Sequence, residues 1–129
     1  MTPQEAYHYA VEIIQGRWPE GEPIILTDPE WAYLYAIVIL HDRWPEAEPI
    51  ILTSAQYTYL YALDIIQGRW PEAESIILTN PGWAYCYAKN VICERWPEAE
   101  PIILQSEFAE RYYQKILRQP KTNWKQEGF

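Results

Sequence analysis

Arg17-Trp18-Pro19-Glu20 is the stretch that decides the fold, because the same four residues occur three more times in the chain. The later copies begin at Arg43, Arg69 and Arg95, so each step is 26 residues without slippage. A fixed period of roughly 20–50 residues is typical of stacked repeats, in which each unit buries its apolar face only against its neighbours. The pattern predicts four tandem repeats over 2–105, with the boundaries 2–27, 28–53, 54–79 and 80–105.

Each repeat, and a partial fifth unit after them, begins with a residue whose side-chain oxygen can cap a helix: Thr2, Asp28, Ser54, Asn80 and Ser106. Large apolar residues and alanines then recur at i, i+4 and i+8, as over 31–40 in the second repeat. This spacing predicts a long helix of about 14 residues in each repeat. The helix is expected to end near Gly16, Asp42, Gly68 or Glu94, and the two glycines suit a left-handed cap.

The second half of each repeat is shorter and contains prolines. In the second repeat, Pro45 can start a helix, but Pro49 would remove a helical hydrogen bond. One or two helical turns are therefore expected, with Ile50, Ile51 and Leu52 turned inward. The fold class that follows is all-α, an α-solenoid of about four and a half helix-turn-helix repeats.

The C-terminal part departs from the repeat. Phe108 and Tyr112 match the aromatic positions of the second repeat only after a one-residue shift, and polar residues replace the outer apolar ones. A terminal repeat with a polar outer face is what a solenoid needs as a cap, so residues 106–118 are predicted to form a C-terminal capping helix. Residues 119–129 are predicted to be a basic tail.

Composition and charge limit the classes of function. Nearly half of the residues are apolar and only two are cysteines, which favours a folded cytoplasmic domain over a disulfide framework. No apolar run approaches the roughly 20 residues of a membrane span. Residues 1–110 hold 17 acidic and 5 basic side chains, a net charge of −12, and residues 111–129 hold 1 and 5, a net charge of +4. The acidic body argues against direct binding of nucleic acid and suits a basic protein partner, or solubility alone.

The Arg-Trp-Pro-Glu run is interpreted as structural, because repetition gives every copy the same environment. Each arginine has two glutamates close by in the sequence, and a ladder of arginine against glutamate between neighbouring repeats would pair some of them. The remaining carboxylates would form an acidic surface, for which the central repeats supply Glu46, Glu48, Glu72 and Glu74.

Paired tyrosines are a second candidate for partner binding. Tyr33 and Tyr59 are each the first of a pair and lie at the flank of the apolar stripe. With Tyr7 and Tyr85 they would form a ladder whose hydroxyls follow one groove and bind a peptide or ligand rings. The alternative is that these tyrosines pack between adjacent repeats.

Positions that vary between repeats give the third candidate. Leu34 and Ile37 share one helix face by i, i+3 spacing, and Leu60 and Leu63 repeat them 26 residues later. If it is exposed, this face is an apolar patch of the kind that marks a protein interface or a homodimer contact. The alternative is that the short helices cover it.

Catalytic, metal and cofactor sites are not predicted. Cys86 and Cys93 are seven residues apart, and His8 and His41 belong to other repeats, so no pair has the close spacing of a zinc site. No serine or cysteine has an evident base, and neither a phosphate-binding loop nor a His-Glu helix motif occurs. We therefore expect that the protein is not an enzyme.

The pattern Tyr-x-Tyr-Ala followed by Gly-Arg-Trp-Pro-Glu-Ala-Glu, over residues 2–105, resembles short helical tandem repeats of uncharacterised phage and giant-virus proteins. The resemblance implies a viral protein that works in the cytoplasm of an infected cell by binding a host component, such as a defence protein. It assigns no role to any single residue.

The leading hypothesis is thus a non-enzymatic repeat module that inhibits a host protein by occupying its surface, with the face around Leu34 and Leu60 as the contact. One alternative is an acidic nucleic-acid mimic that blocks a basic groove with its carboxylates. The other is a small-ligand sponge whose tyrosine ladder stacks nucleotide rings.

Overall fold

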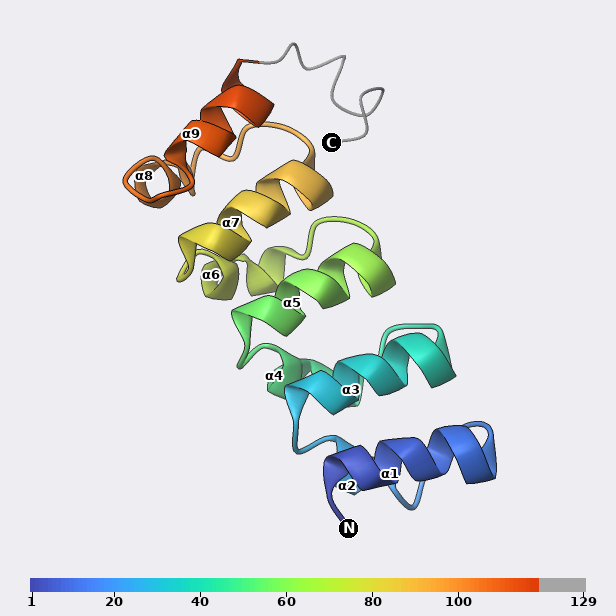
Figure 1. Ribbon diagram of the computed structural model, residues 1–129. Coiled ribbons are helices and arrows are strands. Elements are labelled where there is room, and N and C mark those ends of the chain that lie inside the picture. Colours follow the sequence, from blue (N-terminus) through green and yellow to red (C-terminus); the bar gives the residue numbers. More distant parts are fainter. Residues whose placement is uncertain (119–129) are drawn as a thin grey trace.

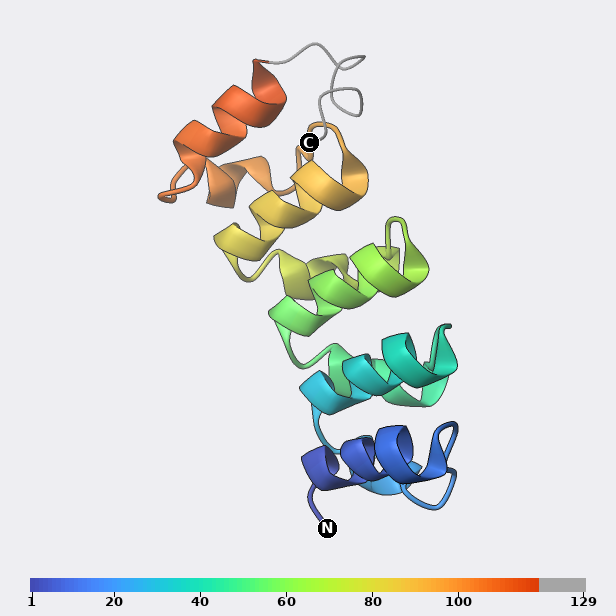
Figure 2. The same cartoon turned by 45° about the vertical axis from the view of Figure 1, so that its right-hand side comes forward.

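The computed structural model describes residues 1–118, which form helices and turns and contain no strand. Long helices lie side by side as one layer, and short helices lie behind them (Figures 1 and 2). The chain passes from long to short helix in each repeat, so the repeats stack in sequence order. The predicted all-α repeat fold is confirmed, and the predicted basic tail, 119–129, lies outside the described residues.

Each long helix is an α-helix that continues directly into a π-helical turn. The α-helical parts are α1 (Pro3–Tyr9), α3 (Pro29–Tyr35), α5 (Ala55–Tyr61) and α7 (Pro81–Tyr87). The π turns are η1 (Ala10–Ile14), η2 (Ala36–Leu40), η4 (Ala62–Ile66) and η6 (Ala88–Ile92). The predicted caps begin these helices, since the side chains of Thr2, Asp28, Ser54 and Asn80 each accept a backbone N–H of the first turn.

A left-handed residue ends each long helix, one position earlier than predicted. The residues with φ between 55° and 62° are Gln15, His41, Gln67 and Cys93. The glycines that follow two of them do not have positive φ, so the expectation of a glycine cap is wrong. The physical reason is the π turn: the Gln15 N–H bonds to the Ala10 carbonyl at 2.7 Å, five residues back, and the chain reverses there.

The short helices carry the second half of the core. They are α2 (Glu22–Ile25), α4 (Glu48–Ile51), α6 (Glu74–Ile77) and α8 (Glu100–Ile103), and the 3₁₀ turns η3 (Pro45–Ala47) and η5 (Pro71–Ala73) precede two of them. Pro49 lies in the first turn of α4, where a missing N–H costs nothing, so it helps to start this helix. Ile51 is fully buried, and Ile50 and Leu52 pack against the core, as predicted.

The fifth unit is shorter than a repeat. It consists of α9 (Ala109–Tyr112) and the π turn η7 (Tyr113–Leu117). Ser106 accepts the Phe108 N–H at 3.1 Å, but no side chain caps α9 itself. The predicted one-residue shift is present: Tyr112 bonds to the backbone of Trp96, 16 residues away, whereas the equivalent bonds in the repeats span 17 residues. α9 begins three residues before Tyr112, whereas α3 begins six residues before Tyr35, so the first turn of the long helix is not α-helical here.

Candidate partner-binding surface

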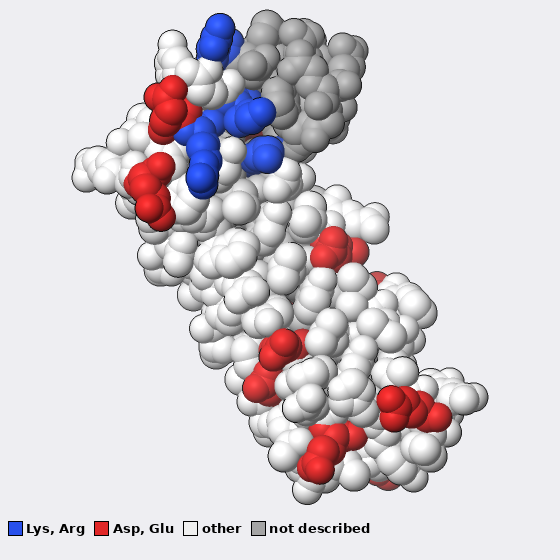
Figure 3. All heavy atoms as spheres, viewed as in Figure 1, with Lys and Arg blue, Asp and Glu red and all other residues white. Residues whose placement is uncertain are grey.

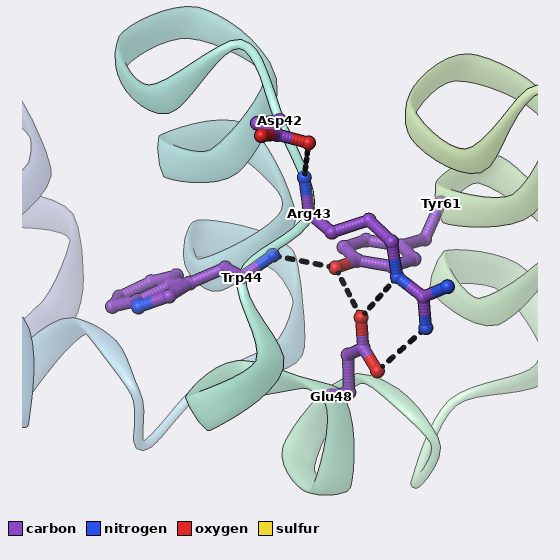
Figure 4. Close-up of polar contacts among 5 residues, drawn as sticks. All are labelled: Asp42, Arg43, Trp44, Glu48 and Tyr61. Atoms are coloured by element: carbon purple, nitrogen blue, oxygen red, sulfur yellow. Dashed lines mark hydrogen bonds and ion pairs between the residues drawn. The ribbon is translucent and has the colours of Figure 1, made fainter.

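A polar cluster joins each repeat to the next, and Figure 4 shows the cluster between the second and third repeats. The Tyr61 hydroxyl accepts a hydrogen bond from the Trp44 backbone N–H at 2.7 Å and donates one to Glu48 at 2.7 Å. Arg43 holds the same carboxylate through Nε and Nη2, each 2.9 Å from a Glu48 oxygen. Since Tyr61 comes from the third repeat and the other residues from the second, the tyrosine hydroxyl is the group that links the two repeats within this cluster.

The same cluster occurs at the other junctions. The backbone N–H groups of the tryptophans donate to the tyrosine hydroxyls at 2.8–3.0 Å, and these hydroxyls donate to glutamates at 2.7–2.8 Å. The three sets are Trp18, Tyr35 and Glu22; Trp70, Tyr87 and Glu74; Trp96, Tyr112 and Glu100. Each arginine pairs with the glutamate five residues later in its own repeat. The predicted arginine–glutamate ladder between neighbouring repeats is therefore wrong, because the tyrosine occupies the side of the carboxylate that faces the neighbour.

The clusters hold ionised carboxylates against neutral hydroxyls. Burial opposes the ionisation of Glu48, but the hydrogen bonds from Arg43 and Tyr61 outweigh it, so the pKa of Glu48 is lowered. Burial and the bond to Glu22 raise the pKa of Tyr35 to about 12. At neutral pH each tyrosine thus donates a charge-assisted hydrogen bond, which is stronger than one between neutral groups.

Half of the predicted acidic surface belongs to these clusters. The side chains of Glu48 and Glu74 are only 16% exposed and are held by an arginine and a tyrosine. Glu46 and Glu72 are exposed. The central repeats therefore offer fewer free carboxylates than their sequence suggests, since one of each pair is neutralised in place.

Tyr33 and Tyr59 lie between repeats. Only 8% of Tyr33 and 6% of Tyr59 is exposed. The Tyr33 hydroxyl donates to Asp64 at 2.6 Å, and the Tyr59 hydroxyl accepts from Asn90 at 2.8 Å, both partners lying in the next repeat. Each ring also packs on an aromatic ring of the next repeat, with centroids 5.8 and 5.5 Å apart. Of the two alternatives for these tyrosines, the structure favours packing between repeats over an open ladder.

The predicted apolar residues lie on the side of the long helices that faces away from the short helices. At about 100° per residue, Leu34 projects opposite Ala32 and Ala36, which are fully buried. Leu60 has the same position one repeat later. The short helices lie behind the long-helix layer, so they do not cover this side (Figure 2). We name it the outer face, made of Leu34, Ile37, Val38, Leu60 and Leu63.

The outer face is partly open to solvent. Four of its side chains are half-buried, because their inner atoms pack against the core. Val38 is 43% exposed. The equivalents of Leu34 in the outer repeats are His8 and Cys86, and those of Ile37 are Val11 and Lys89. Only the two central repeats therefore have a large aliphatic side chain at both positions.

Charge is distributed unevenly on this side of the molecule. Figure 3 shows acidic side chains spaced along the molecule from the N-terminal end to α9, basic side chains gathered near α9, and uncharged surface between them over much of α3, α5 and α7. A partner would thus meet a mostly uncharged centre, an acidic N-terminal end, and an end near α9 where basic and acidic side chains lie together.

One cavity was not predicted from the sequence. It lies between the fourth repeat and the fifth unit, has a volume of about 350 Å³ and is lined by Asn80, Gly82, Trp83, Cys86, Glu107 and Phe108. Gly82 is fitted to this place, because a Cβ there would lie 3.2 Å from the Phe108 ring. The one-residue shift was the sequence signal, since it marks the place where the regular start of the long helix is lost.

Within residues 1–118, no three His, Cys, Asp or Glu side chains come together to hold a metal ion. Cys86 and Cys93 are half-buried free thiols, and burial raises the pKa of Cys86. None of the helices in this part of the chain has both the length and the apolar character needed to cross a membrane.

Comparison with known proteins finds no matching family model, no similar curated protein and no similar solved structure. The resemblance to viral tandem repeats therefore stays a prediction. A proposal for the function therefore rests on the geometry of the outer face.

Proposed function

We propose that this protein is a non-enzymatic scaffold that binds a partner protein through the outer face. The observation that carries the proposal is the position of five apolar side chains on the side of the long helices that is left uncovered by the short helices. A surface patch of this kind is typical of protein interfaces. An inhibitor of a host protein, as the viral resemblance implies, is the narrower form of this proposal.

The scaffold supports such a role because it fixes the geometry of the outer face. Leu34 and Ile37 on one long helix and Leu60 and Leu63 on the next form two adjacent ridges. The tyrosine bonds at each junction hold neighbouring helices in one register. An amphipathic helix of a partner can lay its apolar side between two such ridges, and a rigid binding surface loses little entropy when it binds.

The two alternatives receive less support from the geometry. Glu48 and Glu74 are neutralised by arginines of their own repeat, which leaves a nucleic-acid mimic with Glu46 and Glu72 in the central repeats. The tyrosines of the proposed nucleotide sponge are buried between repeats.

Affinity capture with three forms of the protein tests the proposal. The forms are the wild type, Leu34→Asp with Leu60→Asp, and the control Glu46→Gln with Glu72→Gln. All three forms are first compared by far-UV circular dichroism, and their spectra are expected to agree because the substituted side chains project outward. We expect a partner that is retained by the wild type and the control and lost by the leucine variant.

Other outcomes separate the functions. A partner that survives in the leucine variant at wild-type affinity contradicts the proposal. A partner that is lost in the glutamate variant, and whose affinity falls steeply with salt, indicates the acidic mimic instead.

A further inference from the structure

The first repeat exposes the surface that every later repeat buries. Tyr9 is 37% exposed, whereas its equivalents Tyr35, Tyr61 and Tyr87 are fully buried. Ile13 is 63% exposed, whereas its equivalents are half-buried. Within residues 1–118 the Tyr9 hydroxyl forms no hydrogen bond, and each of the equivalent hydroxyls forms two. The N-terminal end is therefore one half of a repeat junction.

The fourth repeat carries the other half, and the fifth unit covers it imperfectly. α9 packs less extensively on α7 than each long helix packs on the next. The cavity of about 350 Å³ lies in this contact. In the described part of the chain the Tyr85 hydroxyl has no hydrogen-bond partner, although Tyr33 and Tyr59 bond to residues of the following repeat. A regular repeat would fit this surface better than the shortened unit does.

We propose that a second copy of this chain docks its first repeat on the fourth repeat, in place of the fifth unit, so that molecules join head to tail. In the register of the internal junctions, the Tyr9 hydroxyl of the second copy takes the place of Tyr112. It accepts from the Trp96 N–H and donates to Glu100, as Tyr61 does in the second junction. Ile13 then becomes buried, as its equivalents are.

A second contact of the same register supports this pairing. Glu12 is the equivalent of Asp64, which accepts the hydrogen bond of Tyr33. In the docked arrangement Glu12 therefore accepts a hydrogen bond from Tyr85, whose hydroxyl forms none within residues 1–118. Glu5 stands where the internal repeats have an aromatic residue, so this junction is weaker than an internal one and the fifth unit competes with it.

The pairing is heterologous, because two different surfaces meet, and such contacts generate open chains of molecules unless they close into a ring. The fifth unit then acts as the cap that limits assembly, as terminal repeats do in other solenoids. The outer face takes no part in this junction, so the proposal stands or fails separately from the proposed function.

The full-length chain with Tyr112→Ala tests the proposal. This change removes the two hydrogen bonds of the cap and frees the surface of the fourth repeat. We expect the weight-average mass in light scattering to at least double as the protein concentration rises. Adding Ile13→Asp is expected to restore the monomer, and adding the charge-matched control Val38→Asp, on the outer face, is expected to leave assembly unchanged.

A Tyr112→Ala variant that keeps its helical signal and stays monomeric overturns the proposal, as does assembly that Val38→Asp abolishes and Ile13→Asp does not. If Tyr112→Ala loses more helical signal than its fifth unit contributes, the proposal is tested instead by photo-crosslinking in a chain that is otherwise wild type. A benzoylphenylalanine in place of Ile13 is expected to cross-link to residues 96–103 of another molecule. Cross-links confined to its own chain overturn the proposal.

Discussion

Tyr61→Phe tests whether the polar clusters, and not apolar packing alone, hold the repeats together. The change keeps the buried ring and its contact with Trp70 but removes the hydroxyl. The Trp44 N–H then loses its acceptor at a buried position, and Glu48 loses one of its donors. The junction between the second and third repeats is weakened without a cavity larger than one oxygen atom.

The expected loss of stability follows from these two bonds. A buried N–H without a partner costs about 1–3 kcal/mol, and a hydrogen bond to a charged group contributes about 1.5–3 kcal/mol. The second contribution is smaller here, because Arg43 still holds Glu48 and 16% of that glutamate is exposed. We expect the free energy of unfolding to fall by about 2–4 kcal/mol, and the midpoint of thermal unfolding by roughly 10 °C.

Urea unfolding followed by far-UV circular dichroism measures this loss. Tyr9→Phe is the matched control, because it makes the same chemical change at the equivalent position of the first repeat, where the hydroxyl forms no hydrogen bond within the described part of the chain. Its effect is expected to stay within about 0.5 kcal/mol. Equal effects of the two substitutions would refute the role given to the clusters.

Three further predictions concern single sites. Gln67 has a left-handed backbone with φ 62°, which glycine adopts without strain. Gln67→Gly is therefore expected to raise the free energy of unfolding by about 0.5–1 kcal/mol, seen as a higher urea midpoint, and a lower midpoint contradicts this. Gly21→Ala places a Cβ 2.1 Å from Cε3 of Trp18, and a loss of about 1–3 kcal/mol is expected in the same assay; an unchanged midpoint means that the indole moves aside freely. Because the pKa of Tyr35 is raised from 10.0 to about 12, its contribution is complete below pH 10 and is lost as the pH rises toward 12. Stability measured across this range is expected to fall less in Tyr35→Phe, and equal slopes contradict the shift.

The repeat architecture could be predicted because its signals are local and recur. Thr2, Asp28, Ser54 and Asn80 cap their helices through contacts within three residues, so a single chain reveals them. The 26-residue period predicted the stacking order, and helical spacing put Leu34 and Ile37 on one helix face but left open whether the short helices cover it. The shift at Phe108 and Tyr112 identified the irregular fifth unit.

The junctions could not be predicted, because their partners come from different repeats. Glu48 has both Arg43 and Tyr61 within reach, and only the packed structure shows that the arginine belongs to its own repeat and the tyrosine to the next. Tyr33 and Asp64 are 31 residues apart, a separation that no sequence pattern indicated. The left-handed residue at Gln15 was missed for another reason: the π turn shifts the reversal away from the glycine.

Hydrogen–deuterium exchange of the protein with and without its captured partner tests most directly whether the outer face is the binding surface. The account predicts slower exchange in the partner complex over α3–η2 and α5–η4, the two long helices that carry the outer face. Slower exchange confined to the turns around Glu46 and Glu72, with the long helices unchanged, would contradict it.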